Sequence, residues 1–365
     1  MRYVSLHSHS TFSYMDGFGV PEEHVTRVAE LGMKALALTE HGNVSSHVKL
    51  EKACLAIANY KTEVVNGKEV KEFESWKVKP IFGLEAYTAM PDMRETQNQR
   101  KWHMTMLATT LHGYQNLMKM VTRAWADDFY RWPTVTIPNL KDNNEDIICT
   151  SGCADGHLAS QLLGGKGLEP DYDKAVAVLK AYKRILGDRF YLEVQRFPRL
   201  ERSCLLNQQY AIWSKEFRIP LLATSDVHYP QPEQNEMQKI LHAAGRNTGT
   251  VAAAEAEWEY DILLTYPTSD KEIFEDLRGT GLSKRDAEAA IINTEEVAAR
   301  CNVELPKMDR IRYPGTTDDL KPWPPRKSLG RLTPGPFLGT GSTRDGSTEA
   351  STSSPRRRKT STRSA

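Results

Sequence analysis

The sequence predicts an α/β protein in which short strands alternate with helices around a parallel sheet. Two observations support this class: seven short apolar runs recur along the chain up to His228, and longer stretches with helical periodicity separate them. Seven such units are one fewer than a TIM barrel has, so we expect a distorted, TIM-like barrel of seven strands. The predicted strands are Tyr3–His9, Ala35–His41, Pro80–Tyr87, His103–Ala108, Asp146–Cys153, Phe190–Gln195 and Pro220–His228.

Helix boundaries are clearest in the stretches that precede the second and the sixth predicted strands. In residues 21–32, Pro21 and the two glutamates after it suit the first turn of a helix, and Gly32 suits its end. Residues 171–187 end in the same way, at Gly187. These stretches therefore supply the helices that β–α units require.

Beyond the seventh strand the pattern becomes purely helical. Two helical stretches follow at residues 269–282 and 283–301, and Ser283 is a suitable N-cap for the second. We therefore predict a barrel domain at residues 1–260 and a small helical appendage at residues 261–312.

The last segment, residues 313–365, is rich in Pro, Gly, Ser, Thr and Arg and has no hydrophobic period. It cannot bury enough apolar surface to offset its ordering entropy, so we predict that it is disordered. Two explanations of this basic tail remain open. It is either a genuine linker whose residues 355–359 contact nucleic-acid phosphates, or the product of a frame change or truncation, because the composition shifts abruptly after Tyr313.

Composition excludes several classes of protein. The chain has 365 residues, of which 39% are hydrophobic and 26% charged, and its formal net charge is +1. No segment reaches the length of a membrane span, and the first residues lack the apolar core of a signal peptide, so we expect a cytoplasmic protein with no membrane partner. Five cysteines and no CxxC pair predict reduced thiols, which leaves room for one metal-bound cysteine.

The first predicted strand ends in two histidines, His7 and His9, separated by one serine. Alternate residues of a strand point to the same face, so the two imidazoles leave the strand as a pair about 7 Å apart along it. Such a pair can bind one metal ion. From these residues alone, two solvated histidines at a polar strand end remain an equal alternative.

Further potential ligands stand at or near the ends of the other predicted strands, where a parallel barrel gathers its functional side chains. Glu85 lies within an otherwise apolar run, which is a costly position for a carboxylate that has no partner. The candidate metal ligands are His7, His9, Asp16, His41, Glu85, His103, Cys153, Asp226 and His228. We leave out His24, His112 and His242, which fall on helices or loops.

Each of these candidates has an ordinary structural explanation when taken singly, such as a helix cap, a buried thiol or an ion pair. Their joint occurrence at six of seven predicted strand ends instead indicates one metal centre. Imidazole and thiolate favour zinc and its neighbours, and bridging carboxylates favour clustered ions. We therefore predict two or three divalent ions, zinc, manganese or both.

Clustered divalent ions suit the hydrolysis of phosphate esters, because they lower the pKa of a bound water and neutralise phosphate oxygens. We expect the carboxylates Asp16, Glu85 and Asp226 at the catalytic centre. Arg196, after the sixth strand, could reach a substrate phosphate, and a solvated surface arginine is the alternative. The sequence contains no nucleophile elbow or dinucleotide fingerprint, and the Gly-rich residues 162–170 lack the Ser or Thr that a P-loop needs.

The motifs HSHSTFSYMDG, ALTEHGN, IFGLEAY, HMTMLA, TSGC and LLATSDVHY occur in this order and resemble the polymerase and histidinol phosphatase (PHP) domain. The resemblance extends over residues 1–312 and is closest to the version at the N-terminus of the bacterial DNA polymerase III α subunit. It implies a distorted seven-stranded barrel with three metal ions, and it assigns metal binding to all nine candidates. One departure is Glu40, which stands where the family usually has an aspartate.

The resemblance also implies a function in DNA replication, as a 3′–5′ exonuclease that proofreads DNA 3′ ends. Other replisome subunits, or a separately encoded polymerase portion, would be its partners. Two alternatives remain: a phosphatase of the histidinol-phosphatase type that acts on small molecules, and a structural or interaction module of a split or truncated polymerase. A purely structural module would be expected to lack some of the nine ligands. Because no polymerase palm is found in the sequence, we do not expect this chain to extend a primer.

Overall fold

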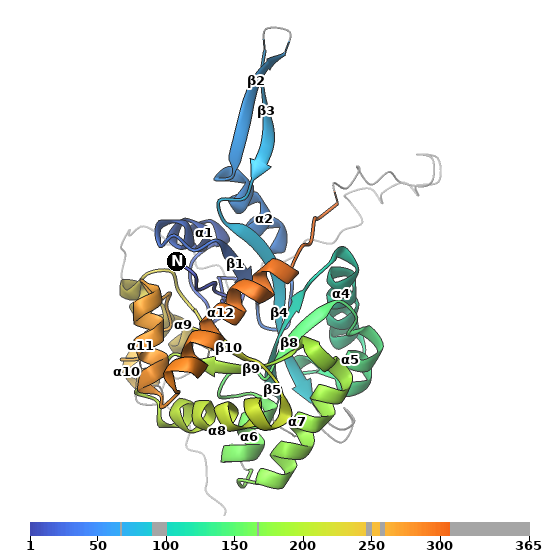
Figure 1. Cartoon of the computed structure of the whole chain (residues 1–365), viewed down its shortest axis with the longest axis vertical. Coiled ribbons are helices and arrows are strands. Elements are labelled where there is room, and N and C mark those ends of the chain that lie inside the picture. The colour runs from blue at the N-terminus through green and yellow to red at the C-terminus, as the bar shows by residue number, and fades with distance from the viewer. Residues whose placement is uncertain (66–67, 90–100, 166–167, 246–249, 256–259, 307–365) are drawn as a thin grey trace, which may run out of the picture. The chain divides into compact units, whose positions relative to one another are not determined.

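The computed structural model describes residues 1–65, 68–89, 101–165, 168–245, 250–255 and 260–306 (Figure 1). Met1–Pro306 forms one compact unit. The tail that we predict to be disordered, residues 313–365, lies outside the described residues. Among the helices of the described part, none is both long enough and apolar enough to span a lipid bilayer.

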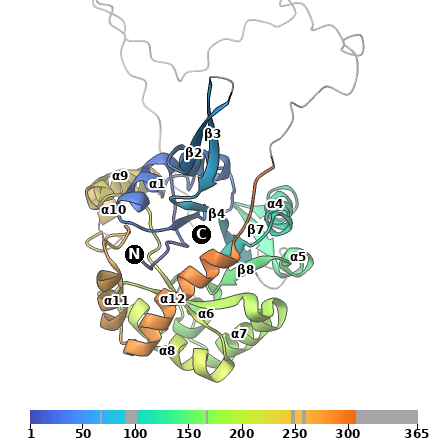
Figure 2. The same cartoon turned by 45° about the horizontal axis from the view of Figure 1, so that its top comes forward.

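A curled sheet of eight strands forms the centre of this unit, and helices lie along its outer side (Figures 1 and 2). Its hydrogen-bonded path is β10–β9–β8–β5–β4–β7–β6, and β1 also pairs with β4. The strands are β1 (Ala35–Leu38), β4 (Lys79–Ala89), β5 (Trp102–Ala108), β6 (Phe129–Tyr130), β7 (Trp132–Thr136), β8 (Ile147–Thr150), β9 (Phe190–Gln195) and β10 (Leu221–Thr224). The α/β class that the sequence predicts is thus confirmed.

The sheet is not parallel throughout, and the prediction was wrong on this point. Strand β1 pairs in parallel with β4, β8 with β9, and β9 with β10. Strand β5, however, is antiparallel to both of its neighbours, β4 and β8. The reversed direction of β5 breaks the parallel order that a succession of β–α units would give.

The first predicted strand, Tyr3–His9, has too few pairs to count as a strand. It forms isolated parallel bridges on both sides, Ser5 with Leu36 and Ser8 with Val227. The His9 amide donates to the Val227 carbonyl at 2.7 Å, and the Ser8 carbonyl accepts from the Thr39 amide at 2.8 Å. This segment therefore lies between β1 and the chain that follows β10. The described residues show a curled sheet, and the distorted seven-stranded barrel that we expected is not confirmed as such.

The predicted helix boundaries are found in the structure. The first helix begins at Pro21, and Gly32 (φ 74°) lies just beyond its end. The helix that follows Asp171 ends at Gly187 (φ 63°). The hydroxyl of Ser283 accepts from the Asp286 amide and so caps the last helix, as predicted. The helices are α1 (Pro21–Glu30), α2 (His47–Ala56), α4 (Leu111–Ala126), α5 (Ile137–Asn143), α6 (His157–Leu163), α7 (Tyr172–Leu186), α8 (Glu201–Phe217), α9 (Asn235–Gly245), α10 (Val251–Glu255), α11 (Asp270–Gly279) and α12 (Lys284–Arg300).

Helix α12 packs against strand ends of the sheet. Its residues Val297 and Ala298 share a buried apolar cluster with Val4, Ala35 and other strand residues. The amide of Val4 also donates to Thr294 Oγ1 at 3.0 Å. Since Val4 and Ala35 lie at the beginnings of their segments, α12 covers the amino ends of the strands and leaves the carboxyl ends to the site described below.

A two-stranded hairpin, β2 (Asn59–Val65) and β3 (Lys68–Ser75), stands away from the central sheet (Figure 1). We did not predict it, because charged residues on both of its faces hide the strand pattern. The signal that was available is the Asn-Gly pair at positions 66 and 67, a typical hairpin dipeptide.

Candidate metal centre

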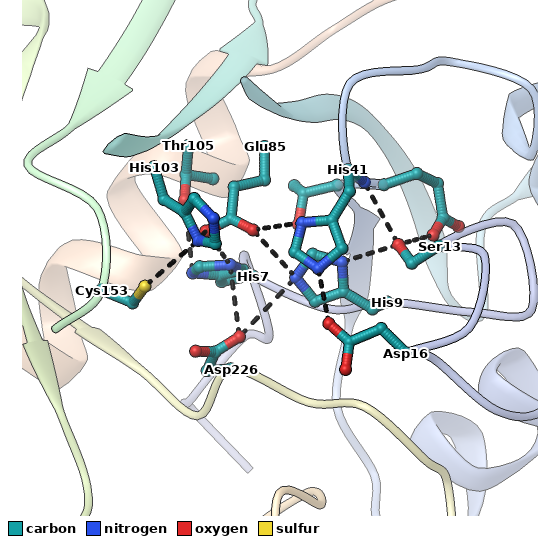
Figure 3. Close-up of polar contacts among 12 residues, drawn as sticks. His7, His9, Ser13, Asp16, His41, Glu85, His103, Thr105, Cys153 and Asp226 are labelled. Carbon is teal, nitrogen blue, oxygen red and sulfur yellow. Dashed lines mark hydrogen bonds and ion pairs between the residues drawn. The ribbon is translucent and has the colours of Figure 1, made fainter. Parts of the chain in front are cut away.

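The first two candidates, His7 and His9, point into a single buried cluster, which lies where the parallel strands end and the antiparallel strand β5 begins (Figure 3). His7 Nε2 lies 3.2 Å from Glu85 Oε1, and His9 Nε2 lies 3.5 Å from Glu85 Oε2. Both imidazoles have no exposed surface. The alternative that they are solvated histidines is therefore wrong.

Glu85, on β4, is the hub of this cluster. Besides His7 and His9, its oxygens approach two further candidates: His41 Nδ1 lies 2.7 Å from Oε2, and His103 Nδ1 lies 3.2 Å from Oε1. The carboxylate is 1% exposed. The strand thus places a buried charge among four imidazoles, which accounts for a polar residue within an apolar run.

The other candidates lie around this hub. His41 Nε2 donates to Asp16 Oδ2 at 2.8 Å, and His228 Nε2 lies 3.3 Å from the same oxygen. Asp226 Oδ1 is 3.4 Å from His7 Nε2, and Cys153 Sγ is 3.5 Å from His103 Nδ1. All nine residues that the sequence singles out are thus brought together.

Several polar atoms of the cluster are buried without a hydrogen-bond partner in the described part of the chain. They are His7 Nε2, His9 Nε2, His41 Nδ1 and both carboxylate oxygens of Glu85. These atoms contact one another as ion pairs and not as hydrogen bonds. A buried polar group without a hydrogen bond costs about 1–3 kcal/mol, and a bound cation would satisfy several of these atoms at once. Imidazole nitrogens and carboxylate oxygens are the donors that zinc and manganese take. The residues therefore fit divalent cations.

Within the described part of the chain, the potential ligand atoms form three groups, and in each group they lie within 4.8 Å of one another. The groups share members, so one side chain lies near more than one candidate ion position. The groups are His9, His41 and His228; His7, His9 and Glu85; and His41, Glu85 and His103.

Burial and neighbouring charges shift the pKa values of the cluster residues in opposite directions. Burial raises the pKa of Glu85, but the neighbouring imidazoles of His103 and His7 outweigh it, and the pKa lies well below its usual value. Burial lowers the pKa of His7, but Asp226, Glu193 and Glu85 outweigh it and hold the pKa well above its usual value. For His9, burial and the nearby imidazoles act together, so its pKa lies well below the usual value.

We expect metal binding to release protons from this centre. Without metal, the His7 imidazole is in its protonated, positively charged form near pH 7. The Cys153 thiol is protonated as well, because burial and nearby carboxylates hold the pKa of Cys153 well above its usual value. A cation must displace these protons, so its affinity should rise between pH 6 and pH 8. Titration calorimetry in two buffers of different ionisation enthalpy checks this, and equal apparent binding enthalpies in both buffers would contradict it.

Glu193, on β9, is a buried member of the site that we did not predict. It accepts from His7 Nδ1 at 2.7 Å, and the hydroxyls of Thr150 and Thr224 also donate to it, at 2.5 and 2.8 Å. These contacts orient the His7 ring so that Nε2 faces Glu85. The signal that could have identified it is the one that identified Glu85, a carboxylate inside an apolar strand.

A second buried network supports His9. His9 Nδ1 donates to Ser13 Oγ at 2.8 Å, and Ser13 Oγ donates to Glu40 Oε2 at 2.6 Å. Ser10 Oγ donates to the other Glu40 oxygen at 2.6 Å. Glu40, whose side chain is one methylene longer than the aspartate usual at this position in the family, therefore acts on His9 through Ser13 rather than directly.

His242, which lies on α9 as the sequence suggested, contacts the candidate ligand Asp16, and we did not predict this contact. Its Nε2 lies 2.5 Å from Asp16 Oδ1, and its Nδ1 lies 2.7 Å from the Tyr260 hydroxyl. It thereby holds Asp16 toward His41 and His228. The two other omitted histidines lie elsewhere: His24 bonds the Tyr266 hydroxyl, and His112 is half-exposed beside Asp146.

Arg196 does not have the surroundings that we expected. Its Nε donates to Asp276 Oδ2 at 2.6 Å, and its guanidinium also pairs with Glu272, both residues of α11. The side chain is 12% exposed, so the solvated-surface alternative is wrong. The two carboxylates neutralise the charge that a substrate phosphate would require.

Unusual backbone conformations flank the cluster. Asp226 has φ 45°, a left-handed conformation that costs a non-glycine residue energy and is typical of functional sites. Gly152, with φ 75°, precedes Cys153, and a Cβ at this position would lie 2.2 Å from the His103 carbonyl oxygen. Only glycine therefore allows the Cys153 loop to approach β5 so closely.

The fold and the site together define the class of this protein. It is an α/β protein whose curled sheet carries clustered imidazoles and carboxylates, a candidate metal centre, at its strand ends. The model of the PHP domain matches residues 5–197, and the chain belongs to this family.

The chain is similar to curated alpha subunits of DNA polymerase III. The chain is 27% identical over 329 residues to the DNA polymerase III subunit alpha of Helicobacter pylori strain 26695, covering 87% of this chain and 24% of the relative. It is 29% identical over 313 residues to that of Treponema pallidum, covering 84% and 24%. The matched part is the N-terminal region of these relatives. The chain thus spans about a quarter of the length of the curated relatives it matches.

A solved amidohydrolase from Chromobacterium violaceum covers 62% of this chain and 88% of its own, at 13% identity and a TM-score of 0.37. This likeness is too low to bear on function.

Proposed function

We propose that this chain is a metal-dependent phosphoesterase that binds two or three divalent ions, zinc, manganese or both. The observation that carries the proposal is the group of five buried ligand atoms on His7, His9, His41 and Glu85, which form no hydrogen bond among the described residues and converge on one another. The ions would be held by His7, His9, Asp16, His41, Glu85, His103, Cys153, Asp226 and His228.

When bound, such ions supply a water of lowered pKa and compensate the charge of the phosphate. The protein's own part is to hold the carboxylates in place. Asp16 is fixed by contacts with His41, His228 and His242. Gln195 Nε2 donates to Asp226 Oδ2 at 3.0 Å, which leaves Oδ1 facing His7 and His9.

As the substrate we propose the 3′ end of DNA, which the chain would shorten as a 3′–5′ exonuclease. Similarity to polymerase III alpha subunits over 84–87% of the chain supports this choice. Other replisome subunits, or a separately encoded polymerase portion, would be its partners. The same donors would also serve a phosphatase for small phosphomonoesters, so the two substrate classes must be compared directly.

We expect His9→Ala to abolish hydrolysis and to lower the metal content, because it removes a donor that belongs to two of the three groups. The test combines metal analysis of the purified protein with hydrolysis assays on mispaired primer 3′ ends and on small phosphomonoesters. His112→Ala, which changes a half-exposed histidine outside the cluster, is the matched control. Unchanged metal content in the His9 variant would remove His9 from the site, and no hydrolysis by the metal-loaded parent protein would refute the phosphoesterase.

A further inference from the structure

Four aromatic residues, Tyr87, Trp125, Phe129 and Trp132, lie next to the metal centre, and we call them the aromatic rim. Three of them are substantially exposed: Trp125 is 52% exposed, Phe129 48% and Trp132 51%. Single exposed apolar residues are common, but a group of large aromatic side chains beside a site typically marks a binding surface.

Tyr87 connects the rim to the metal centre. It follows Glu85 by two residues on β4, so both side chains leave the same face of the strand. Its ring centroid lies 5.8 Å from that of His41 and 5.4 Å from that of His103. On its other side the ring lies 5.1 Å from Trp132. A continuous series of rings therefore runs from two candidate ligands to an exposed indole.

The other two members of the rim, Trp125 and Phe129, lie beside the loop that follows His41. Trp125 Nε1 donates to the carbonyl of Gly42, the residue after His41, at 2.9 Å. The rings of Trp125 and Phe129 are stacked, with centroids 5.2 Å apart and planes inclined by 17°. Gly42 itself has φ 63°, and a Cβ there would lie 2.6 Å from Pro133, so the loop packs tightly beneath the rim.

We propose that the aromatic rim is a stacking subsite for the unpaired bases of a DNA strand whose terminal phosphodiester lies at the metal centre. Every base has an aromatic face, so exposed aromatic side chains bind single strands without regard to sequence. The ring series begins at the candidate metal ligands, and this continuity favours a substrate over a protein partner. The inference rests on the proposed function and adds to it a preference for frayed or single-stranded 3′ ends.

The test is a double-mutant cycle on binding. The probes are an oligothymidylate with uncleavable phosphorothioate linkages and the same strand lacking the bases of its 3′-terminal nucleotides. We expect Trp132→Ala to weaken binding of the intact strand roughly 10-fold, whereas the base-free strand loses nothing further. Trp132→Phe should retain most of the affinity, and Phe129→Ala, which changes a second exposed ring, should weaken the same probe. Ile212→Ala, at an exposed position of α8, is the control.

Equal losses for both strands would overturn the inference, and so would no loss at all. A lowered metal content in the Trp132 variant would also overturn it, because Trp132 would then support the centre rather than the substrate. Binding does not depend on cleavage. A protein that shows the base-dependent coupling but hydrolyses no phosphoester therefore supports the stacking subsite and refutes only the proposed function.

Discussion

Replacing Glu85 with alanine is expected to prevent metal binding and to lower phosphoester hydrolysis by more than about 100-fold. Loss of a residue that only orients a metal ligand lowers activity by at most about 100-fold, and we expect Glu85 itself to be a ligand. Its two oxygens approach His7, His9, His41 and His103, and both lack a hydrogen bond among the described residues. Without this carboxylate, the centre loses one negative charge and the side chain that its imidazoles share. Metal analysis and hydrolysis assays on the purified variant measure both effects.

Two further variants sharpen this test. Glu85→Gln keeps the size of the side chain and one oxygen, and because it lacks the charge we expect it to lose metal as well. Glu63→Ala, which removes an exposed carboxylate from the hairpin strand β2, controls for a general change in net charge. Full metal content in folded Glu85→Ala would show that Glu85 is not a ligand.

Replacing Glu193 with alanine is expected to destabilise the fold by about 3–5 kcal/mol, the usual cost of breaking a buried ion pair. Glu193 is 2% exposed and accepts from His7 and from two threonine hydroxyls, all of which would lose their acceptor. Burial raises the pKa of Glu193, but His7 outweighs it and holds the pKa below its usual value, so the carboxylate is charged near neutral pH. Urea unfolding of the metal-free protein measures the loss.

The same change should weaken metal binding about 10- to 100-fold, because the His7 ring would no longer be oriented. Glu193→Gln retains an acceptor oxygen for His7 Nδ1 and should therefore lose less stability than the alanine variant. Metal titration of both variants separates the two effects. An alanine variant as stable as the parent protein would show that the pair with His7 contributes nothing to the fold.

Much of the centre follows from the sequence, because residue type and strand position are enough to place a donor. Parallel strands bring their carboxyl ends to one edge, so His41 after β1 and Asp226 after β10 must lie near each other whatever the details of packing. The alternation of side chains along a segment likewise places His7 and His9 together. Applied consistently, the same reasoning would have identified Glu193, a carboxylate in an apolar strand like Glu85.

The sequence alone thus determined the α/β class, the helix boundaries at Gly32 and Gly187, and which residues meet at the strand ends, since these depend on local periodicity and strand direction. Only the tertiary structure decided the contacts that have no local signature. His242 reaches Asp16 across 226 residues from a helix, α11 neutralises Arg196, and β5 runs antiparallel. Such contacts depend on how whole helices and strands pack, and that packing is set by the complete set of buried surfaces rather than by any one segment.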